Sequence, residues 1–319
     1  MHVSLSGLRI DRGGRRILDI ATLDFPPGTV TAVFGPNGSG KTTLLRALAG
    51  LERSDGAVTI GGRPVSRGDR RVAIAFQEPV FVRGTVRANL ALGLELRGVP
   101  ARESDTRLAS VAAACGIAGL LERSPRELST GEAQRVNLAR ALALAAPVTL
   151  LDEPLSGFDR IGRSRMLEEV PALLAAHAAT AVVVTHDREE AFRLARRLVL
   201  LIDGRVAAAG DAAVIYRAPP DAESARLLGY TVVPAAGRLV GFPPGALRHG
   251  QGPAQFELTV TREVDMGNHR HLVGVTDAEA GAIVAEIRLA EGEPAAAPGT
   301  RITVHPSRWV DFPVPGSRS

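Results

Sequence analysis

The sequence predicts an α/β protein in which a mostly parallel sheet with crossover helices is followed by a small all-β domain. Three observations lead to this fold class. Short β-branched runs alternate with longer amphipathic stretches over about the first 230 residues. A glycine-rich loop at 35–40 lies between an apolar run and a helical stretch. After Tyr216, clusters of Pro and Gly interrupt the helical pattern, and short alternating segments follow.

The parallel sheet is predicted from five apolar, β-branched runs: Thr29–Phe34, Val72–Phe76, Val148–Leu151, Ala181–Thr185 and Leu198–Ile202. Two amphipathic stretches, Glu132–Ala145 and Asp187–Arg197, predict helices. The second begins at Asp187 and has Glu190 three residues later, which predicts a capping box. The section at about 85–130 has a helical pattern without strand signals, so we expect a helical subdomain there.

The last part of the chain predicts a small β domain at 235–319, separate from a first domain at 1–230. Pro and Gly turns break the pattern before its short alternating segments. The strands expected there are Gln255–Thr261, His271–Thr276, Ala282–Leu289 and Arg301–His305.

Charge and cysteine content exclude several classes of function. The 319 residues include 38 Lys plus Arg against 34 Asp plus Glu, and only 4% are aromatic. A nucleic-acid surface would combine a basic stripe with interleaved aromatic side chains, whereas these arginines are dispersed, so we expect no nucleic-acid partner. The single cysteine, Cys115, has no partner for a disulfide or a thiolate metal site. Because no apolar stretch reaches the ~20 residues of a membrane span, we expect any membrane role to come through partners.

The glycine-rich segment matches the phosphate-loop pattern of Gly, four residues and Gly-Lys-Thr. It consists of Gly35, Pro36, Asn37, Gly38, Ser39, Gly40, Lys41 and Thr42, and Thr43 follows. Glycines let backbone N–H groups converge on phosphate oxygens, and the helix N-terminus adds partial positive charge. Thr42 offers a hydroxyl to Mg²⁺. Lys41 is the only lysine of the chain, and its slim ammonium suits a phosphate better than the wide guanidinium used at the other basic positions.

The apolar run Val148–Leu151 ends in two acids, Asp152 and Glu153. In a phosphate-loop nucleotidase, a Mg²⁺ ligand and a water-activating base would lie there. Asp152 would hold the metal, directly or through water, and Glu153 would polarise the attacking water. By itself such a run is more often a strand that enters a solvated turn.

The order of motifs along the chain resembles the nucleotide-binding subunit of an ABC transporter over residues 3 to about 230. The ordered set is the phosphate loop, Gln77, Leu128-Ser129-Thr130-Gly131-Glu132, Asp152-Glu153, Ser156-Gly157-Phe158-Asp159 and His186. The resemblance implies a phosphate-loop nucleotidase core with an antiparallel β subdomain and a helical subdomain. It also implies an ATPase that uses ATP and Mg²⁺.

The resemblance implies roles for the remaining motif residues. Gln77 would sense Mg²⁺ and the permease, and His186 would contact the γ-phosphate and the attacking water. Ser129 and Gly131 would close over ATP bound to the opposite subunit, and Asp159 would lie in the loop that joins the two sites.

Residue chemistry supports two of these roles. Ser129 can cap the helix Glu132–Ala145, which makes an anion site without a lysine, and such a half-site suits a phosphate held by a second subunit. His186 follows the strand Ala181–Thr185, at the sheet edge where open α/β sheets place ligands.

The sequence departs from the family pattern in two places, the signature loop and the adenine-stacking position. Thr130 and Glu132 stand where the family usually has Gly and Gln, so the signature loop is bulkier and more acidic near the partner's phosphates. Arg12 stands where the family usually stacks an aromatic on adenine. Two interpretations of Arg12 remain open: its guanidinium plane stacks on adenine, or it is a solvated surface arginine with a weaker base contact.

Residues from about 235 to 319 resemble the transport-associated OB domain of importer ATPases. The likeness depends on the Pro–Gly turns and on the segment Gly299–Pro306. It implies dimer contact and regulation, and the alternative is a β appendage that only stabilises the dimer.

Together these features predict the ATPase subunit of a bacterial-type ABC importer at the cytoplasmic face of the membrane. It would act as a head-to-tail homodimer with two ATP, docked on integral-membrane permease subunits and served by an extracytoplasmic solute-binding protein. The segment Phe81–Leu94 resembles ATPases of inorganic-ion importers, for molybdate, tungstate, sulfate or ferric iron. The alternative is a soluble ABC-type ATPase that acts on nucleic acid or ribosomes without transport.

Overall fold

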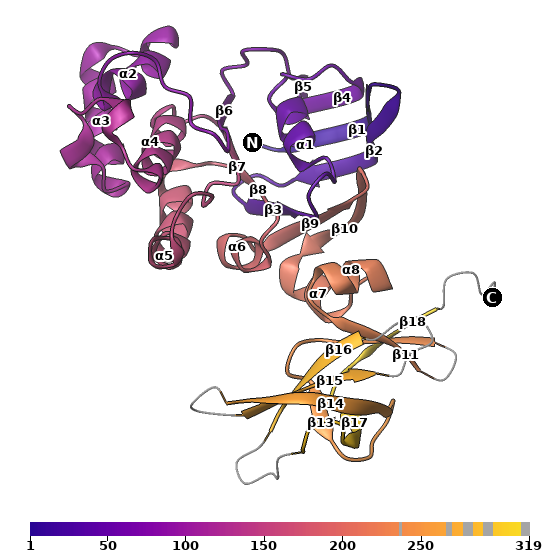
Figure 1. Cartoon of the computed structure of the whole chain (residues 1–319). Coiled ribbons are helices and arrows are strands. Elements are labelled where there is room, and N and C mark those ends of the chain that lie inside the picture. Colours follow the sequence, from indigo (N-terminus) through magenta and orange to yellow (C-terminus); the bar gives the residue numbers. More distant parts are fainter. Residues whose placement is uncertain (236–237, 266–269, 277–282, 290–295, 314–319) are drawn as a thin grey trace. The chain divides into compact units, whose positions relative to one another are not determined.

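A computed structural model describes residues 1–235, 238–265, 270–276, 283–289 and 296–313 (Figure 1). The chain divides into two compact units, Met1–Val214 and Ile215–Ser319. Across the described ranges, no helix combines the length and the apolar character needed to cross a membrane.

A six-stranded sheet forms the centre of the first unit, in the order β10-β9-β3-β8-β7-β6. Its strands are β3 (Val30–Phe34), β6 (Val72–Ala75), β7 (Val148–Asp152), β8 (Ala181–Thr185), β9 (Arg197–Ile202) and β10 (Arg205–Asp211). All neighbours pair in parallel except β10, which is antiparallel to β9. The five predicted strands are therefore confirmed, and β7 and β8 are buried along their whole length because both faces of the sheet are covered.

A second, antiparallel sheet of the first unit has the order β2-β1-β4-β5. Its strands are β1 (Val3–Arg12), β2 (Arg15–Phe25), β4 (Asp55–Ile60) and β5 (Arg63–Pro64). Helix α1 (Lys41–Leu48) joins the two sheets, because its Leu44 and Leu45 share one buried apolar cluster with Leu18 of β2 and Leu150 of β7. The predicted antiparallel subdomain is present, and it packs on the helix that follows the phosphate loop.

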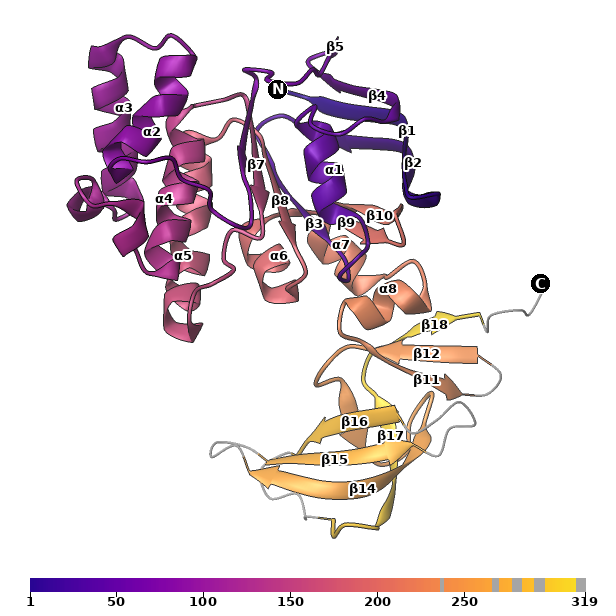
Figure 2. The same cartoon turned by 45° about the horizontal axis from the view of Figure 1, so that its top comes forward.

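The remaining helices of the first unit are α2 (Val86–Leu96), α3 (Ala101–Ala114), α4 (Thr130–Ala143), α5 (Arg160–His177) and α6 (Arg188–Leu194), with short 3₁₀ turns at Ala118–Leu120 and Pro125–Glu127. Helices α2 to α5 gather on one side of this unit, opposite the antiparallel sheet (Figures 1 and 2). The predicted helical section at 85–130 is thus confirmed. Helix α6 ends earlier than predicted because Arg197 already begins β9.

The second unit contains helices α7 (Ala212–Arg217, which begins in the first unit) and α8 (Ala222–Leu227) and two antiparallel sheets. One sheet has the order β11-β12-β18, and the other has the order β13-β17-β14-β15-β16. The strands are β11 (Thr231–Ala235), β12 (Arg238–Phe242), β13 (Leu247–His249), β14 (Phe256–Asp265), β15 (Arg270–Thr276), β16 (Ile283–Arg288), β17 (Arg301–Pro306) and β18 (Val310–Phe312). The predicted small β domain is present, although Ala282 of one expected strand lies outside the described residues.

The second unit begins at Ile215, whereas the sequence predicted the division at 230–235. Packing explains the earlier boundary. The Tyr230 hydroxyl donates to the backbone oxygen of Tyr216, and the two rings meet edge to face with centroids 5.5 Å apart. Residues 215–230, which precede β11, therefore belong to the second unit.

Candidate functional site

The glycine-rich loop joins β3 to α1 and holds Lys41 at the start of that helix. The Lys41 side chain is buried, and its Nζ donates to the backbone oxygens of Gly35 and Pro36, both at 2.9 Å. Burial lowers the pKa of Lys41, while the carboxylates of Glu153 and Asp152 act in the opposite direction. The ammonium thus lies in the loop with two acids near enough to affect it.

The loop has the backbone and the polar groups that fit a bound phosphate. Gly38 and Gly40 have φ of 82° and 96°, and a Cβ on Gly40 would lie 2.6 Å from the Leu18 side chain. Only glycine tolerates that combination. The Ser39 hydroxyl is buried without a hydrogen-bond partner among the described residues, so it is available to a ligand. Pro36 and Asn37 form the exposed side of the loop.

Asp152 at the end of β7 lies beside the start of α1, where its Oδ1 accepts a hydrogen bond of 3.2 Å from the Thr42 hydroxyl. Burial raises the pKa of Asp152, and the Thr42 hydrogen bond and Lys41 counteract it. The described residues contain no group of three or more His, Cys, Asp or Glu that could hold a metal by themselves. A carboxylate and a hydroxyl beside a phosphate-binding loop do fit Mg²⁺, which takes few protein ligands plus substrate phosphates. Thr43 follows in α1 and is half-buried.

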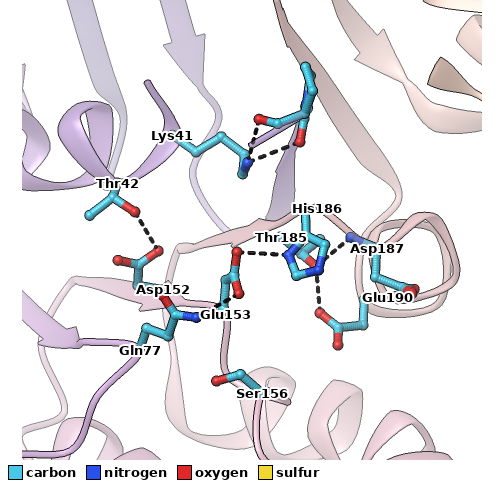
Figure 3. Close-up of polar contacts among 12 residues, drawn as sticks. Lys41, Thr42, Gln77, Asp152, Glu153, Ser156, Thr185, His186, Asp187 and Glu190 are labelled. Atoms are coloured by element: carbon cyan, nitrogen blue, oxygen red, sulfur yellow. Dashed lines mark hydrogen bonds and ion pairs between the residues drawn. The ribbon is translucent and has the colours of Figure 1, made fainter. Parts of the chain in front are cut away.

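Glu153 is the meeting point of three segments that are far apart in the sequence. Its Oε2 accepts 2.9 Å from Gln77 Nε2, and its Oε1 lies 2.8 Å from His186 Nδ1 (Figure 3). Because a carboxylate only accepts, His186 donates from Nδ1. Glu153 itself has φ of 45°, a left-handed conformation that costs a non-glycine residue energy and is concentrated at functional sites. Both oxygens of one carboxylate are therefore held in place.

Gln77 is fixed by helix α4, through two residues that sequence reasoning did not single out. Gln134 Nε2 donates to the Gln77 backbone oxygen at 2.6 Å, and Asn137 Nδ2 donates to the Phe76 oxygen at 2.8 Å. Gln134 and Asn137 are three positions apart on α4 and both are buried, so they face one direction. A pair of amides at this spacing inside an apolar helix is the signal that could have predicted them.

Ser129 caps helix α4, and Glu132 completes a capping box with it. The Glu132 N–H donates to the Ser129 hydroxyl at 3.3 Å, and Glu132 Oε2 accepts at 2.8 Å from both the N–H and the hydroxyl of Ser129. These hydrogen bonds lower the pKa of Glu132. The cap predicted at Ser129 is present, and its hydroxyl is already bonded to a carboxylate of the same chain.

Gly131 and Asp159 lie on neighbouring helix starts. A Cβ on Gly131 would lie 3.3 Å from the Phe158 ring, so the first turn of α4 packs on the loop before Asp159. Asp159 caps α5 by accepting 2.7 Å from the Gly162 N–H. Within the described part of the chain, the hydrogen bonds of Ser129 and Asp159 stay within their own helix starts and do not reach Glu153.

Arg12 at the end of β1 is ion-paired. Its Nη2 donates to Glu52 Oε1 at 2.7 Å, and Arg46 Nε of α1 lies 3.3 Å from the other oxygen of Glu52. Neither interpretation of Arg12 from the sequence included this partner. The pair is exposed on the Arg12 side, so the guanidinium face is not covered by Glu52.

Comparisons with known proteins agree with this geometry. A model of the ABC transporter family matches residues 18–156. An "Fe(3+) ions import ATP-binding protein FbpC" of Streptomyces coelicolor is 42% identical over 239 residues, which is 73% of this chain and 69% of the relative. A "Sulfate/thiosulfate import ATP-binding protein CysA" of Nocardia farcinica is 34% identical over 96% of this chain and its own full length. A solved "ATP binding subunit of ABC transporter" is similar with TM-score 0.61 and 27% identity over 68% of this chain and 92% of that one.

The fold and the residues around Glu153 define a phosphate-loop nucleotidase. The chain belongs to the ABC transporter family as an ATP-binding subunit, and its activity is ATP hydrolysis. The relatives named above are import proteins, which supports the predicted importer class and not the alternative of an ATPase without transport. An importer subunit of this family is membrane-associated and works with membrane permease subunits.

Proposed function

We propose that this chain energises uptake of an inorganic ion, and that Glu153 is the base of its ATPase reaction. One observation carries the assignment: both oxygens of the Glu153 carboxylate are held, by Gln77 at 2.9 Å and by His186 at 2.8 Å, beside the buried Asp152. A base fixed in this way needs no reorganisation when it accepts a proton from the attacking water.

The phosphates of ATP would be held by the loop between β3 and α1. The binding residues are Gly35, Pro36, Asn37, Gly38, Ser39, Gly40, Lys41, Thr42 and Thr43. The free hydroxyl of Ser39 and the Lys41 ammonium support this proposal. Lys41 would exchange its two backbone carbonyl partners for phosphate oxygens, which gains charge-assisted hydrogen bonds.

Thr42 and Asp152 are the residues that would hold Mg²⁺, with Gln77 as a further oxygen ligand. Mg²⁺ supplies charge neutralisation for the phosphate oxygens. The 3.2 Å contact between Thr42 and Asp152 supports this, because it brings a hydroxyl and a carboxylate oxygen together beside the phosphate loop. His186 would hold its imidazole toward the γ-phosphate, since its Nδ1 is engaged by Glu153 and its Nε2 is the remaining polar atom.

A second copy of this chain would complete each site. We propose a head-to-tail homodimer in which Ser129, Gly131 and Glu132 of one copy close over ATP held by the other, with Asp159 between the two sites. The position of Ser129 at the N-terminus of the 14-residue helix α4 supports this role. Arg12 would contact the adenine through its uncovered guanidinium face while Glu52 holds its edge.

The cargo would be ferric iron, sulfate or a related oxyanion such as molybdate or tungstate, because the two import proteins compared above are named for ferric iron and for sulfate. The subunit would lie at the cytoplasmic face of the membrane, and an extracytoplasmic solute-binding protein would deliver the ion to the permease. The first unit would be the nucleotide-binding domain, and the second would contact the dimer partner and regulate it.

The test compares the purified parent chain with two single variants of the full chain. Glu153→Gln keeps the size of the side chain but cannot accept the proton, so we expect loss of turnover of about 100-fold or more and a trapped ATP-bound dimer in size-exclusion chromatography. Glu103→Gln on the exposed face of α3 is the matched control and should hydrolyse ATP like the parent chain. Normal turnover by Glu153→Gln would refute the assignment of the base.

A further inference from the structure

The backbone on both sides of His186 is held by a closed ring of hydrogen bonds. The Thr185 hydroxyl donates to Glu190 Oε2 at 2.6 Å, and the Asp187 N–H donates to that hydroxyl at 3.0 Å. The Glu190 N–H donates to Asp187 Oδ1 at 2.9 Å and closes the ring. Figure 3 shows Thr185, His186, Asp187 and Glu190 beside Glu153. His186 lies in the sequence between Thr185 and Asp187, which are both members of this ring.

The capping box predicted at this helix is only half formed. Asp187 does cap α6 by accepting the Glu190 N–H. The Glu190 carboxylate, however, turns away from the Asp187 backbone and bonds the Thr185 hydroxyl instead. The Glu190 carboxylate therefore does not cap the start of α6 but holds the Thr185 hydroxyl.

Glu190 is a buried acid that the proposed reaction does not use. Its side chain is 5% exposed, and burial raises its pKa, while Thr185 and Arg163 counteract that change. Arg163 supplies the opposite charge: its Nη2 lies 2.9 Å from Glu190 Oε1 and 2.8 Å from Asp187 Oδ2. One guanidinium nitrogen thus joins two residues of the ring.

Arg163 belongs to α5, whereas the residues of the ring lie at the end of β8 and the start of α6. It lies in the first turns of α5, where its N–H donates to the Asp159 backbone oxygen at 2.8 Å. The Asp159 side chain caps the same turn through Gly162. Arg163 therefore connects the start of α5, next to Asp159, with the segment that carries His186.

We propose that Arg163 and Glu190 are positioning residues that keep His186 within hydrogen-bonding distance of Glu153 and link its position to the Asp159 loop. The proposal rests on the roles proposed above for Glu153 and His186. Glu190 acts through Thr185 and Asp187, and Arg163 neutralises the buried carboxylate that would otherwise be unpaired. Neither residue is among those proposed to bind the nucleotide.

Substitution of Arg163 or Glu190 should lower turnover and leave ATP binding almost unchanged. Ser39 lies in the loop between β3 and α1, and Lys41 begins α1. Within the described residues, neither shares a hydrogen bond with Arg163 or Glu190. A displaced imidazole would lose its contact with Glu153, and a shift of about 1 Å at such a group can cost about 100-fold in rate.

The experiment compares four variants of the full chain. Arg163→Ala and Glu190→Gln should each lower kcat about 10-fold or more, with the KM for ATP within about 2-fold of the parent. Arg163→Lys should recover part of kcat, since one ammonium can still reach one carboxylate. Arg193→Ala is the matched control, because Arg193 also joins α6 to α5, through Glu168 at 3.8 Å, but does not touch the ring.

A readout at His186 itself separates positioning from general stability. The His186 imidazole signal in a ¹H–¹³C NMR spectrum, identified with His186→Gln, should shift or broaden in Arg163→Ala and stay unchanged in Arg193→Ala. If kcat and this signal in Arg163→Ala match those of Arg193→Ala while Glu153→Gln is inactive, the positioning role is wrong and the proposed function stands. If Glu153→Gln turns over normally, the proposed function itself fails.

Discussion

Nδ1 of His186 lies 2.8 Å from Oε1 of Glu153, although 33 residues and helix α5 separate them in the chain. The contact arises because β7 and β8 are adjacent parallel strands in register, with Asp152 opposite Val184. Residues that follow their carboxyl ends therefore lie at one edge of the sheet. The imidazole and the carboxylate depend on each other for orientation.

Replacement of His186 by Ala should reduce turnover by about 100-fold or more and leave ATP affinity within a few-fold, because the phosphate loop is untouched. Steady-state turnover together with equilibrium binding of ATP measures both effects. His2→Ala, which removes an exposed histidine paired with Asp24, is the control. Equal turnover in the two variants would contradict the role given to His186.

Lys41→Arg should weaken ATP binding about 10-fold or more even though the charge is retained. Lys41 is 6% exposed, and its ammonium donates to two backbone carbonyls at 2.9 Å. A planar guanidinium is wider and cannot take the same position without displacing the loop. Fluorescent-nucleotide titration measures the change. Arg87→Lys, an exposed substitution on α2, should bind ATP as the parent does, and comparable loss in both variants would argue against the steric explanation.

Glu132→Gln should strengthen the ATP-dependent dimer by about 2- to 10-fold when it is introduced into the Glu153→Gln chain. The carboxylate bonds the Ser129 hydroxyl, the group proposed to receive the partner's phosphate, so removal of its charge removes a repulsion between like charges. Analytical ultracentrifugation at several protein concentrations measures the dimer constant. Glu127→Gln, in the preceding turn, serves as the control, and weaker association in Glu132→Gln than in that control would refute the prediction.

Asp69→Asn should lower the free energy of unfolding by about 1.5–3 kcal/mol at pH 7. Asp69 accepts two hydrogen bonds of 2.9 Å from Arg71, whose guanidinium also bonds the backbone oxygen of Ile60. The Arg71 hydrogen bonds hold the pKa of Asp69 below its usual value. The stabilisation is therefore complete above the ordinary carboxyl pKa and is lost as pH falls through the lowered pKa of the folded state.

Urea unfolding of the parent and of Asp69→Asn over a pH series tests that linkage. The difference between them should shrink toward zero at acid pH. Asp105→Asn, an exposed change on α3, should show little difference at any pH. If the difference in free energy of unfolding between the parent and Asp69→Asn grew as the pH fell, the predicted linkage would be refuted.

Cys115 should resist thiol reagents in the folded chain. It is 1% exposed, and burial raises its pKa to about 12, so at pH 8 only about one thiol in 10⁴ is ionised. Ellman's reagent should react with the unfolded parent and hardly with the native one. In Ser110→Cys, on the exposed face of α3, one equivalent should react quickly, and equally fast labelling of the native parent would show that the burial is wrong.

Much of the site could be predicted because its residues belong to local patterns. The phosphate loop, the acids after β7 and the histidine after β8 each end or begin an element, so the strand pattern alone predicted the edge at which they meet. The contact of Gln77 with Glu153 spans 76 residues and depends on amides of α4 that fix the Gln77 backbone. No local pattern contains that information.

Two further features also depend on tertiary contacts. Glu190 satisfied the sequence rule for a capping box, but its carboxylate instead pairs with the half-buried guanidinium of Arg163 from another helix and with the Thr185 hydroxyl. No sequence pattern singled out Glu52, which is the partner of Arg12 in the fold. Packing determines which charged partners come close to a side chain, and the spacing of residues in the sequence does not predict them.

A single lysine gives this chain a built-in chemical reporter. An amine-directed acylating reagent has one side-chain target, Lys41, apart from a chain's amino terminus. Burial lowers the pKa of that amine and so raises the fraction that is nucleophilic, while its position in the phosphate loop leaves it to be masked by a bound nucleotide. Mass spectrometry of the one peptide that contains Lys41 would then measure the nucleotide occupancy of this chain in the intact transporter, because this chain has no other lysine.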